Sequence, residues 1–124
     1  MSDRSQMPER VEKPWGHELI YARTDRYLGK ILHVRSGCRL SLQFHRRKDE
    51  TILVRGGTLL VEIEEEGRLV SKTLGPGEGC RIRPLQKHRF TARTECEILE
   101  VSTPEGDDVV RLEDDYGRAL EPDP

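Results

Sequence analysis

Apolar and polar residues alternate in short runs along most of the chain, and turn residues separate one run from the next. The runs cover residues 19–22, 27–34, 39–45, 51–55, 58–65, 68–74, 80–83, 88–92 and 97–102. A period of two is typical of β-strands with one buried face. Short strands at spacings of about 8 to 12 residues predict an all-β sandwich or barrel. Helical periodicity is not sustained in any segment, although a short helix in the last twenty residues would fit the sequence.

Glycine-rich turns support this interpretation. A Glu-Glu-Gly turn at residues 65–67 predicts a hairpin between the runs 58–65 and 68–74. The sequence Gly-Pro-Gly-Glu-Gly at residues 75–79 is a strong turn signal before the next run.

The two ends differ from the middle of the chain. Residues 1–10 are polar, and we expect a disordered N-terminus there. Pro14 forbids a helix interior in the following arm, and Trp15, the single tryptophan, is expected to anchor that arm to the body. Residues 104–124 form an acidic tail whose apolar residues suggest partial docking. We therefore expect one domain, with a barrel over residues 11–103.

Composition narrows the function. With a formal net charge of -2, the chain has no basic surplus for binding nucleic acid. Its apolar runs fall short of the roughly 20 residues of a membrane span, and its first residues do not resemble a secretory signal. The three cysteines, Cys38, Cys80 and Cys96, form no CxxC pair and fit a reducing compartment. We expect a cytoplasmic protein without disulfides.

Four side chains are candidate metal ligands. Gln43 and His45 are two residues apart, so both project from the same face of a strand. Glu50 follows after a charged turn, and His88 begins a later run. Each residue alone would be an ordinary polar side chain. Together, one amide oxygen, two imidazoles and one carboxylate favour a divalent metal with open coordination positions.

The run 39–45 separates polar from apolar side chains. Its polar face carries Arg39, Ser41, Gln43 and His45, and its apolar face carries Leu40, Leu42 and Phe44. If the polar face points into the barrel, the apolar face needs a cover. A second sheet, the N-terminal arm or a partner subunit could provide it, and on this basis we expect a homodimer.

Four motifs occur in a distinctive order. They are Lys-Pro-Trp-Gly-His-Glu at 13–18, Leu-Ser-Leu-Gln-Phe-His at 40–45 with Glu50, the stretch 77–89 ending in His88 and Arg89, and Ile-Leu-Glu-Val at 98–101 followed by residues 107–118. Through these motifs, residues 11–118 resemble the cupin domain of type II mannose-6-phosphate isomerases. The resemblance implies a jelly-roll barrel, also called a double-stranded β-helix, with an N-terminal arm and a C-terminal tail.

The resemblance also implies a ligand set of Gln43, His45, Glu50 and His88, with glutamine in place of the first histidine of the general cupin pattern. Zinc is the implied metal. Because oxygen-rich sites also accept other ions, manganese, iron and nickel remain alternatives.

The chain departs from the family pattern near the expected substrate position. The departures are Arg46, Arg47, Thr51, Ile52, Arg83, Leu85 and Ser102. None of them removes a ligand, so they concern the substrate more than the metal.

The function implied is a metal-dependent aldose–ketose isomerase acting on a sugar phosphate. Basic side chains near the ligands could hold the phosphate, because guanidinium and ammonium groups pair with phosphate oxygens. The candidates are Arg39, Lys48, Arg89 and, from the closing motif, Arg111. Glu100 and Lys30, which match family positions, are the candidates for the base that moves the proton.

Two alternatives stay open. One is a non-catalytic, metal-holding cupin that binds a sugar or a small acid. The other is a different cupin enzyme, such as a lyase, an epimerase or an oxygenase. An oxygenase would need iron and more histidine ligands, which fits this chain poorly. His17 and His33 have no matched role in any of these readings.

Overall fold

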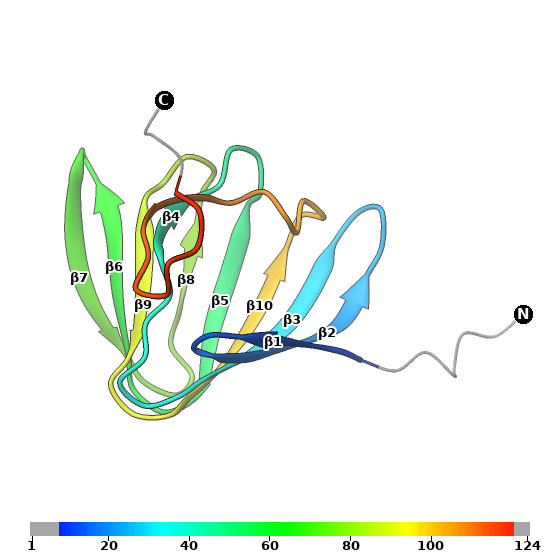
Figure 1. The fold of residues 1–124 in the computed structure, drawn as a ribbon, viewed down its shortest axis with the longest axis horizontal. Helices are drawn as coiled ribbons and strands as arrows, with labels where there is room; N and C mark the ends of the chain where they lie inside the picture. Colours follow the sequence, from blue (N-terminus) through cyan, green and yellow to red (C-terminus); the bar gives the residue numbers. More distant parts are fainter. Residues whose placement is uncertain (1–7, 121–124) are drawn as a thin grey trace, which may run out of the picture.

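The structure, a computed structural model, describes residues 8–120. These residues form two antiparallel sheets that face each other, and they contain no helix (Figure 1). In order across the larger sheet the strands are β1 (Glu9–Lys13), β2 (Gly16–Arg23), β3 (Leu28–Val34), β10 (Cys96–Ser102), β5 (Glu50–Gly56) and β8 (Gly79–Ile82). In the smaller sheet they are β11 (Val110–Glu113), β4 (Leu42–Phe44), β9 (His88–Ala92), β6 (Leu59–Glu65) and β7 (Arg68–Leu74). The all-β barrel expected from the sequence is confirmed.

The core lies between the sheets. Alternate residues of β5 and β6 are buried, as a period-two pattern requires. Apolar side chains from both sheets form one cluster, which includes Trp15, Leu32, Ile52, Val61, Ile82, Phe90 and Ile98. Trp15 is therefore the anchor that the sequence predicted.

Turns fix the register of neighbouring strands. β6 and β7 form the predicted hairpin, paired from Leu59 opposite Leu74 to Glu65 opposite Arg68. The turn after β5 needs glycine, because Gly57 has a φ of 85° and a Cβ there would lie 2.1 Å from the Glu95 carbonyl oxygen.

The sequence pattern did not predict two of the strands, β1 and β11. β1 pairs with β2, so Glu9 and Arg10 belong to a strand and not to a disordered N-terminus; residues 1–7 lie outside the described residues. β11 pairs with β4, and the helix considered for the last twenty residues is absent over 105–120. Both strands join a sheet edge, so their partners, more than their own patterns, determine their structure.

The tail runs beside residues 39–45, with β11 as the edge strand next to β4. Val110 stands opposite Phe44, and both are buried. The Tyr116 hydroxyl donates to the Arg39 carbonyl oxygen at 2.9 Å, which ties the tail to this segment. Phe44 thus has an apolar neighbour within the chain, and Leu40 lies in the core cluster, while the homodimer expected from the sequence stays a prediction.

Candidate metal centre and its pocket

Three predicted ligands meet between the sheets. His45 directly follows β4, Glu50 begins β5 and His88 begins β9, so the ends of three strands bring them together. Their ligand atoms all lie within 4.8 Å of one another, and all three residues are buried. Glu50 Oε1 lies 2.9 Å from His45 Nε2 and 3.6 Å from His88 Nε2.

Backbone carbonyls orient both imidazoles. His45 Nδ1 lies 2.5 Å from the Asp108 carbonyl oxygen, and His88 Nδ1 lies 2.9 Å from that of Gln86. A carbonyl only accepts, so each Nδ1 is the protonated nitrogen and each Nε2 faces Glu50. His88 Nε2 is buried without a hydrogen-bond partner among the described residues. The Nε2 atoms of both rings thus converge on the Glu50 carboxylate, an arrangement that fits a divalent cation.

The charges of these groups also suit a metal. Burial lowers the pKa of His88 to about 4, so its imidazole is neutral near pH 7. Burial opposes ionisation of Glu50, but the His45 hydrogen bond and the Lys48 charge outweigh it and hold the pKa of Glu50 well below its usual range. Neutral histidine and ionised glutamate are the forms that bind metal ions.

Gln43, the fourth predicted ligand, is placed beside this group. It stands opposite His88 in the β4–β9 pair and lines the same pocket as His45 and Glu50. Ser41 Oγ donates a hydrogen bond of 2.5 Å to Gln43 Oε1. Ser41 thereby orients an amide that could complete the coordination.

A second loop supports the ligands from the tail. The carboxylate of Asp108 accepts hydrogen bonds from three consecutive backbone N–H groups, those of Arg46, Arg47 and Lys48, at 2.7–3.1 Å. The same residue accepts the His45 Nδ1 bond through its carbonyl. Asp108 therefore fixes both the imidazole and the loop between His45 and Glu50.

Buried charges continue from the ligands along the pocket. Lys48 Nζ lies 2.8 Å from Glu100 Oε2 and 3.9 Å from Glu50 Oε2, and Lys30 pairs with Glu18 at 3.3 Å. Burial and the Glu50 charge raise the pKa of Glu100 to about 7. Burial works against the charge of Lys48, but the carboxylates of Glu100 and Glu50 raise its pKa. Both candidate bases, Glu100 and Lys30, thus lie in the pocket and in ion pairs.

Basic side chains line another part of the pocket. They are Lys13 from β1, Arg111 from β11, and Arg118. Arg111 Nε is buried without a hydrogen-bond partner among the described residues, while Arg118 pairs with Asp114 at 2.8 Å. Burial and the nearby Arg118 charge lower the pKa of Arg111.

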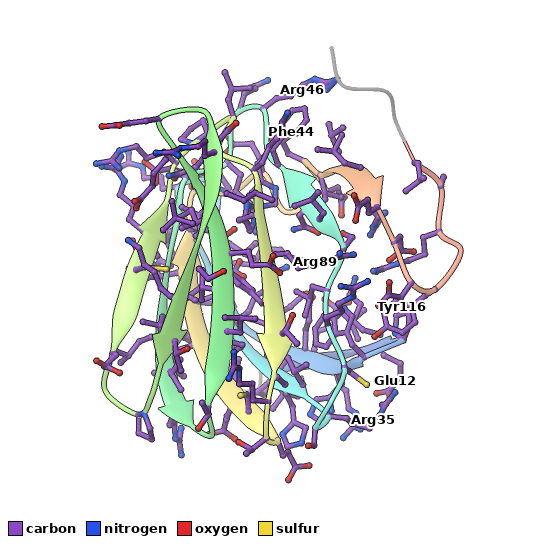
Figure 2. The ribbon with its side chains drawn as sticks, turned by 90° about the vertical axis from the view of Figure 1, so that its left-hand side faces the viewer. Glu12, Arg35, Phe44, Arg46, Arg89 and Tyr116 are labelled. Carbon is purple, nitrogen blue, oxygen red and sulfur yellow. The ribbon has the colours of Figure 1, made fainter. Side chains whose placement is uncertain are left out.

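Two predicted substrate ligands lie elsewhere. Arg39 pairs with Asp115 of the tail at 2.6 Å, and Arg89 Nε donates to the Leu40 carbonyl at 2.9 Å. Neither lines the pocket, and Figure 2 shows Arg89 on the side where the tail and Tyr116 pass β4. Arg89 also donates to the side chain and the carbonyl of Glu113 in the tail at 3.3 Å, so both arginines attach the tail. Residues 40 and 41 are not part of a strand, and Leu40 lines the pocket. The alternation of polar and apolar side chains expected over 39–45 is therefore interrupted there.

Lys13 and Glu18 line the pocket without a role assigned from the sequence, and Trp15, expected only as an anchor, lines it too. All three belong to the Lys-Pro-Trp-Gly-His-Glu motif, while Arg118 belongs to the closing motif that also supplied Arg111. Their place in conspicuous motifs was the available signal, but only the fold shows that the β1–β2 turn reaches the pocket.

A two-sheet antiparallel barrel with a buried His/Glu group that could hold a metal is the arrangement of a cupin. The sequence matches the mannose-6-phosphate isomerase C-terminal family over residues 2–114. The chain belongs to this family, as its motifs indicated.

Relatives agree with this assignment. The chain is 32% identical over 117 residues to the alginate biosynthesis protein AlgA of Pseudomonas aeruginosa, which matches 90% of this chain and 24% of AlgA. It is 35% identical over 117 residues to the mannose-1-phosphate guanylyltransferase ManC of Salmonella typhimurium, with coverage of 90% and 24%. The chain thus spans about a quarter of the length of these relatives.

Solved structures share the fold. KdgF from Halomonas sp. superposes with a TM-score of 0.70 at 20% identity, covering 86% of this chain and 94% of KdgF. Oxalate decarboxylase from Bacillus subtilis gives a TM-score of 0.74 at 18% identity, covering 85% of this chain and 30% of the enzyme. At these identities the likeness concerns the fold alone. No helix of the described residues is long and apolar enough to span a membrane.

Proposed function

We propose that the pocket is the active site of a metal-dependent aldose–ketose isomerase that acts on a sugar phosphate, with zinc as the metal. One observation carries the proposal. A single pocket is lined both by His45 and Glu50, two members of the buried His45–Glu50–His88 group, and by the basic side chains of Lys13, Arg111 and Arg118. A sugar phosphate presents matching chemistry, with hydroxyl and carbonyl oxygens at one end and an anion at the other.

The basic side chains would bind the phosphate. Arg111 has a buried nitrogen without a partner, and burying such a donor is costly unless a ligand accepts its hydrogen bond. A phosphate oxygen is a strong acceptor for it, and Arg118 and Lys13 add positive charge to the lining of the same pocket. This assignment replaces Arg39 and Arg89, which are engaged with the tail.

The reaction needs a group that takes a proton from C2 and returns it to C1. A bound divalent metal would polarise the carbonyl and hydroxyl oxygens of the substrate. Glu100 Oε is the proposed carrier of the proton, because it is buried in the pocket and Lys48 fixes its carboxylate. Trp15, Leu32 and Phe90 line the same pocket and would exclude water from the reacting carbons.

The family description makes mannose-6-phosphate the first substrate to try. A phosphorylated substrate also suits the cytoplasmic location expected from the sequence. The departures at Thr51, Arg83 and Leu85 make other hexose and pentose phosphates the next substrates.

The test is interconversion of mannose-6-phosphate and fructose-6-phosphate with added zinc. We expect turnover by the native chain, loss of both metal and turnover in His45→Ala, and loss of turnover with retained metal in Glu100→Gln. Failure to turn over any hexose or pentose phosphate, with zinc bound, would sink the proposal.

A non-catalytic metal-holding cupin is the second candidate. Both candidate bases are held in buried ion pairs, Glu100 with Lys48 and Lys30 with Glu18, which favours a binding role. A sugar or small acid that raises the melting temperature without being converted would support this reading.

A further inference from the structure

Two histidines lie side by side on the outer face of the larger sheet. His17 on β2 stands directly opposite His33 on β3, and their rings stack with centroids 5.1 Å apart and an interplanar angle of 8°. Glu18, the next residue along β2, lines the pocket, so His17 projects from the opposite face of the sheet. The proposed isomerase therefore uses neither imidazole of this pair.

Carboxylates flank the two imidazoles in the same cross-strand row. Glu12 on β1 stands opposite His17, and Glu97 on β10 stands opposite His33. Residues directly opposite each other in antiparallel strands project from the same face, with Cβ atoms about 4.5–5.5 Å apart. The row thus places two imidazoles between two carboxylates across four adjacent strands.

A further carboxylate orients the ring of His33. His33 Nε2 lies 2.9 Å from Glu95 Oε2. An ionised carboxylate only accepts hydrogen bonds, so Nε2 carries the proton and the lone pair of the neutral ring is on Nδ1. Carboxylates commonly hold metal-binding histidines in this way. Glu95 thus prepares His33 to bind a cation through Nδ1.

His17 is also in a suitable state to bind a cation. Within the described part of the chain, its ring nitrogens make no hydrogen bond. Burial lowers the pKa of His17, and the charge of Arg10 lowers it further, although the Glu12 carboxylate acts in the opposite direction. Its imidazole is therefore neutral near pH 7, which is the form that binds metal ions.

We infer that His17 and His33 bind a second divalent transition-metal cation, with Glu12 as the third ligand. Imidazole and carboxylate ligands suit zinc, nickel and copper. Tetrahedral zinc, with Zn–N bonds of about 2.0–2.1 Å, needs the two ring nitrogens about 3.3–3.4 Å apart, which the rings reach by tilting out of their stack. Glu12 would exchange its exposed ion pair with Arg10, at 2.5 Å, for the cation, since exposed pairs contribute little.

A cation at this outer histidine site, defined as His17, His33 and Glu12, would link three strands. They are β1, β2 and β3, which are neighbours at one end of the larger sheet (Figure 1). The β1–β2 arm supplies Lys13 and Glu18 to the pocket on the inner side. The outer cation would therefore clamp, from the other side of the sheet, the arm that lines the pocket.

The outer histidine site should bind more weakly than a structural zinc site. It has three ligands and is open to water, so we expect a Kd of about 1–10 μM for Zn²⁺, well above that of four-ligand sites. Gel filtration in metal-free buffer removes a cation held at this strength. The metal content of the purified chain then reports the inner group alone, and titration measures the outer histidine site.

Isothermal titration of the full chain with Zn²⁺ tests the inference. The chain has four histidines, so the double variant His45→Ala with His88→Ala leaves the outer pair as its only imidazoles. We expect this double variant to bind one Zn²⁺. Adding His17→Phe should weaken binding at least about tenfold, because a ligand is lost. Phenylalanine keeps an aromatic ring for the stack, so the melting temperature should not fall.

The carboxylates have a matched control. Glu12→Gln should weaken Zn²⁺ binding, and Glu95→Gln should weaken it by about tenfold through the orientation of His33. Glu9→Gln removes the same charge from β1 at an exposed position outside the row, and it should leave binding unchanged. Equal weakening by Glu9→Gln and Glu12→Gln would remove Glu12 from the ligand set.

A double variant that binds no Zn²⁺ at about 100 μM would overturn the inference, and so would binding that His17→Phe and His33→Phe leave unchanged. If the double variant does not fold, the native chain provides the same test. Its weaker Zn²⁺ binding event should vanish in His17→Phe while the tighter one remains, and a native chain without a second event would contradict the site. None of these results depends on turnover, so the isomerase proposal stands or fails separately.

Discussion

The two faces of the larger sheet invert the usual distribution of side chains. The inner face carries charges beside the pocket, and Glu100 and Lys30 are both buried there. The outer face carries exposed aliphatic residues, and Val101 is the direct neighbour of Glu100 along β10. Burying ionised groups and exposing apolar groups both work against stability. The comparison teaches that folding alone does not account for either face, and on the inner face the buried charges lie beside a His/Glu group that could hold a metal.

Removing a candidate metal ligand should have the largest effect of all. The effect should be on metal binding at the inner face of the larger sheet. In His88→Ala the metal affinity should fall by at least about 100-fold, because a direct ligand matters more than the surrounding groups whose loss costs 10–100-fold. Elemental analysis of the purified protein measures this. His33→Ala is the control, since His33 stacks on His17 on the outer face with ring centroids 5.1 Å apart. Equal metal content in both variants would contradict the site.

Breaking the inner ion pair should be the next largest effect. Glu100→Leu leaves Lys48 buried beside its more distant partner Glu50, and removing one member of a buried pair costs about 3–5 kcal/mol of unfolding free energy. Urea unfolding measures the loss. The double variant Glu100→Leu with Lys48→Met removes the orphaned charge and should recover much of the stability. A double variant no more stable than the single one would show that the pair itself was not the cause.

The carboxylates of Asp114 and Asp49 allow an ion pair that is sheltered from water to be compared with an exposed one. Arg118 hydrogen-bonds Asp114, whose side chain is buried, and Arg81 hydrogen-bonds Asp49 on the outer rim; each arginine lowers the pKa of its carboxyl. Asp114→Asn should cost about 1–2 kcal/mol at pH 7 because the hydrogen bonds to its carboxylate are charge-assisted. Asp49→Asn should cost less than about 1 kcal/mol and should depend on salt.

The pH dependence of these two variants has a defined sign. A lowered folded-state pKa means that the stabilisation is complete above the unfolded pKa, near 3.8, and is lost as the pH falls through the lower folded value. Thermal unfolding between pH 7 and pH 2 should therefore show both variants converging on the native chain at acid pH. A difference that persists undiminished at pH 2 would argue against the charge as its source.

The smallest effect is expected for a mild change on the outer face. Leu53→Thr should alter the unfolding free energy by less than about 0.5 kcal/mol at concentrations where the chain is monomeric. Association between copies through this face would stabilise the native chain at higher concentrations, and the difference would then grow. A difference that does not change with concentration would argue against self-association through the outer face of the larger sheet.

Period-two patterning and turn residues were enough to place most strands and the β6–β7 hairpin. They were not enough for β11, because a segment reading Val-Arg-Leu-Glu becomes a strand only where the edge of β4 accepts it. The ligand positions of His45, Glu50 and His88 followed from spacing and resemblance together. Spacing alone could not predict that Glu100 pairs with Lys48 and that Glu18 pairs with Lys30.

Arg39 and Arg89 show why the remaining contacts could not be predicted from the sequence. Arg39 belongs to the polar face by alternation, but the chain leaves the ladder at residues 40–41 and turns that side chain toward Asp115. Arg89 neighbours the ligand His88, and consecutive strand residues face opposite sides, so it points to the tail. Lys13 and Glu18 reach the pocket only because Trp15 buries the β1–β2 turn.

Asp108 links the tail to His45, a candidate metal ligand, so docking of the tail and binding of a metal are thermodynamically coupled. Its carbonyl orients His45, and its carboxylate holds the backbone of residues 46–48. A cation that binds better when the tail is docked must favour the docked tail by the same free energy. We expect zinc to slow amide hydrogen exchange at Arg46, Arg47 and Lys48, and Asp108→Ala to speed it while weakening zinc binding. Identical exchange with and without zinc would show that the tail and the ligand behave independently.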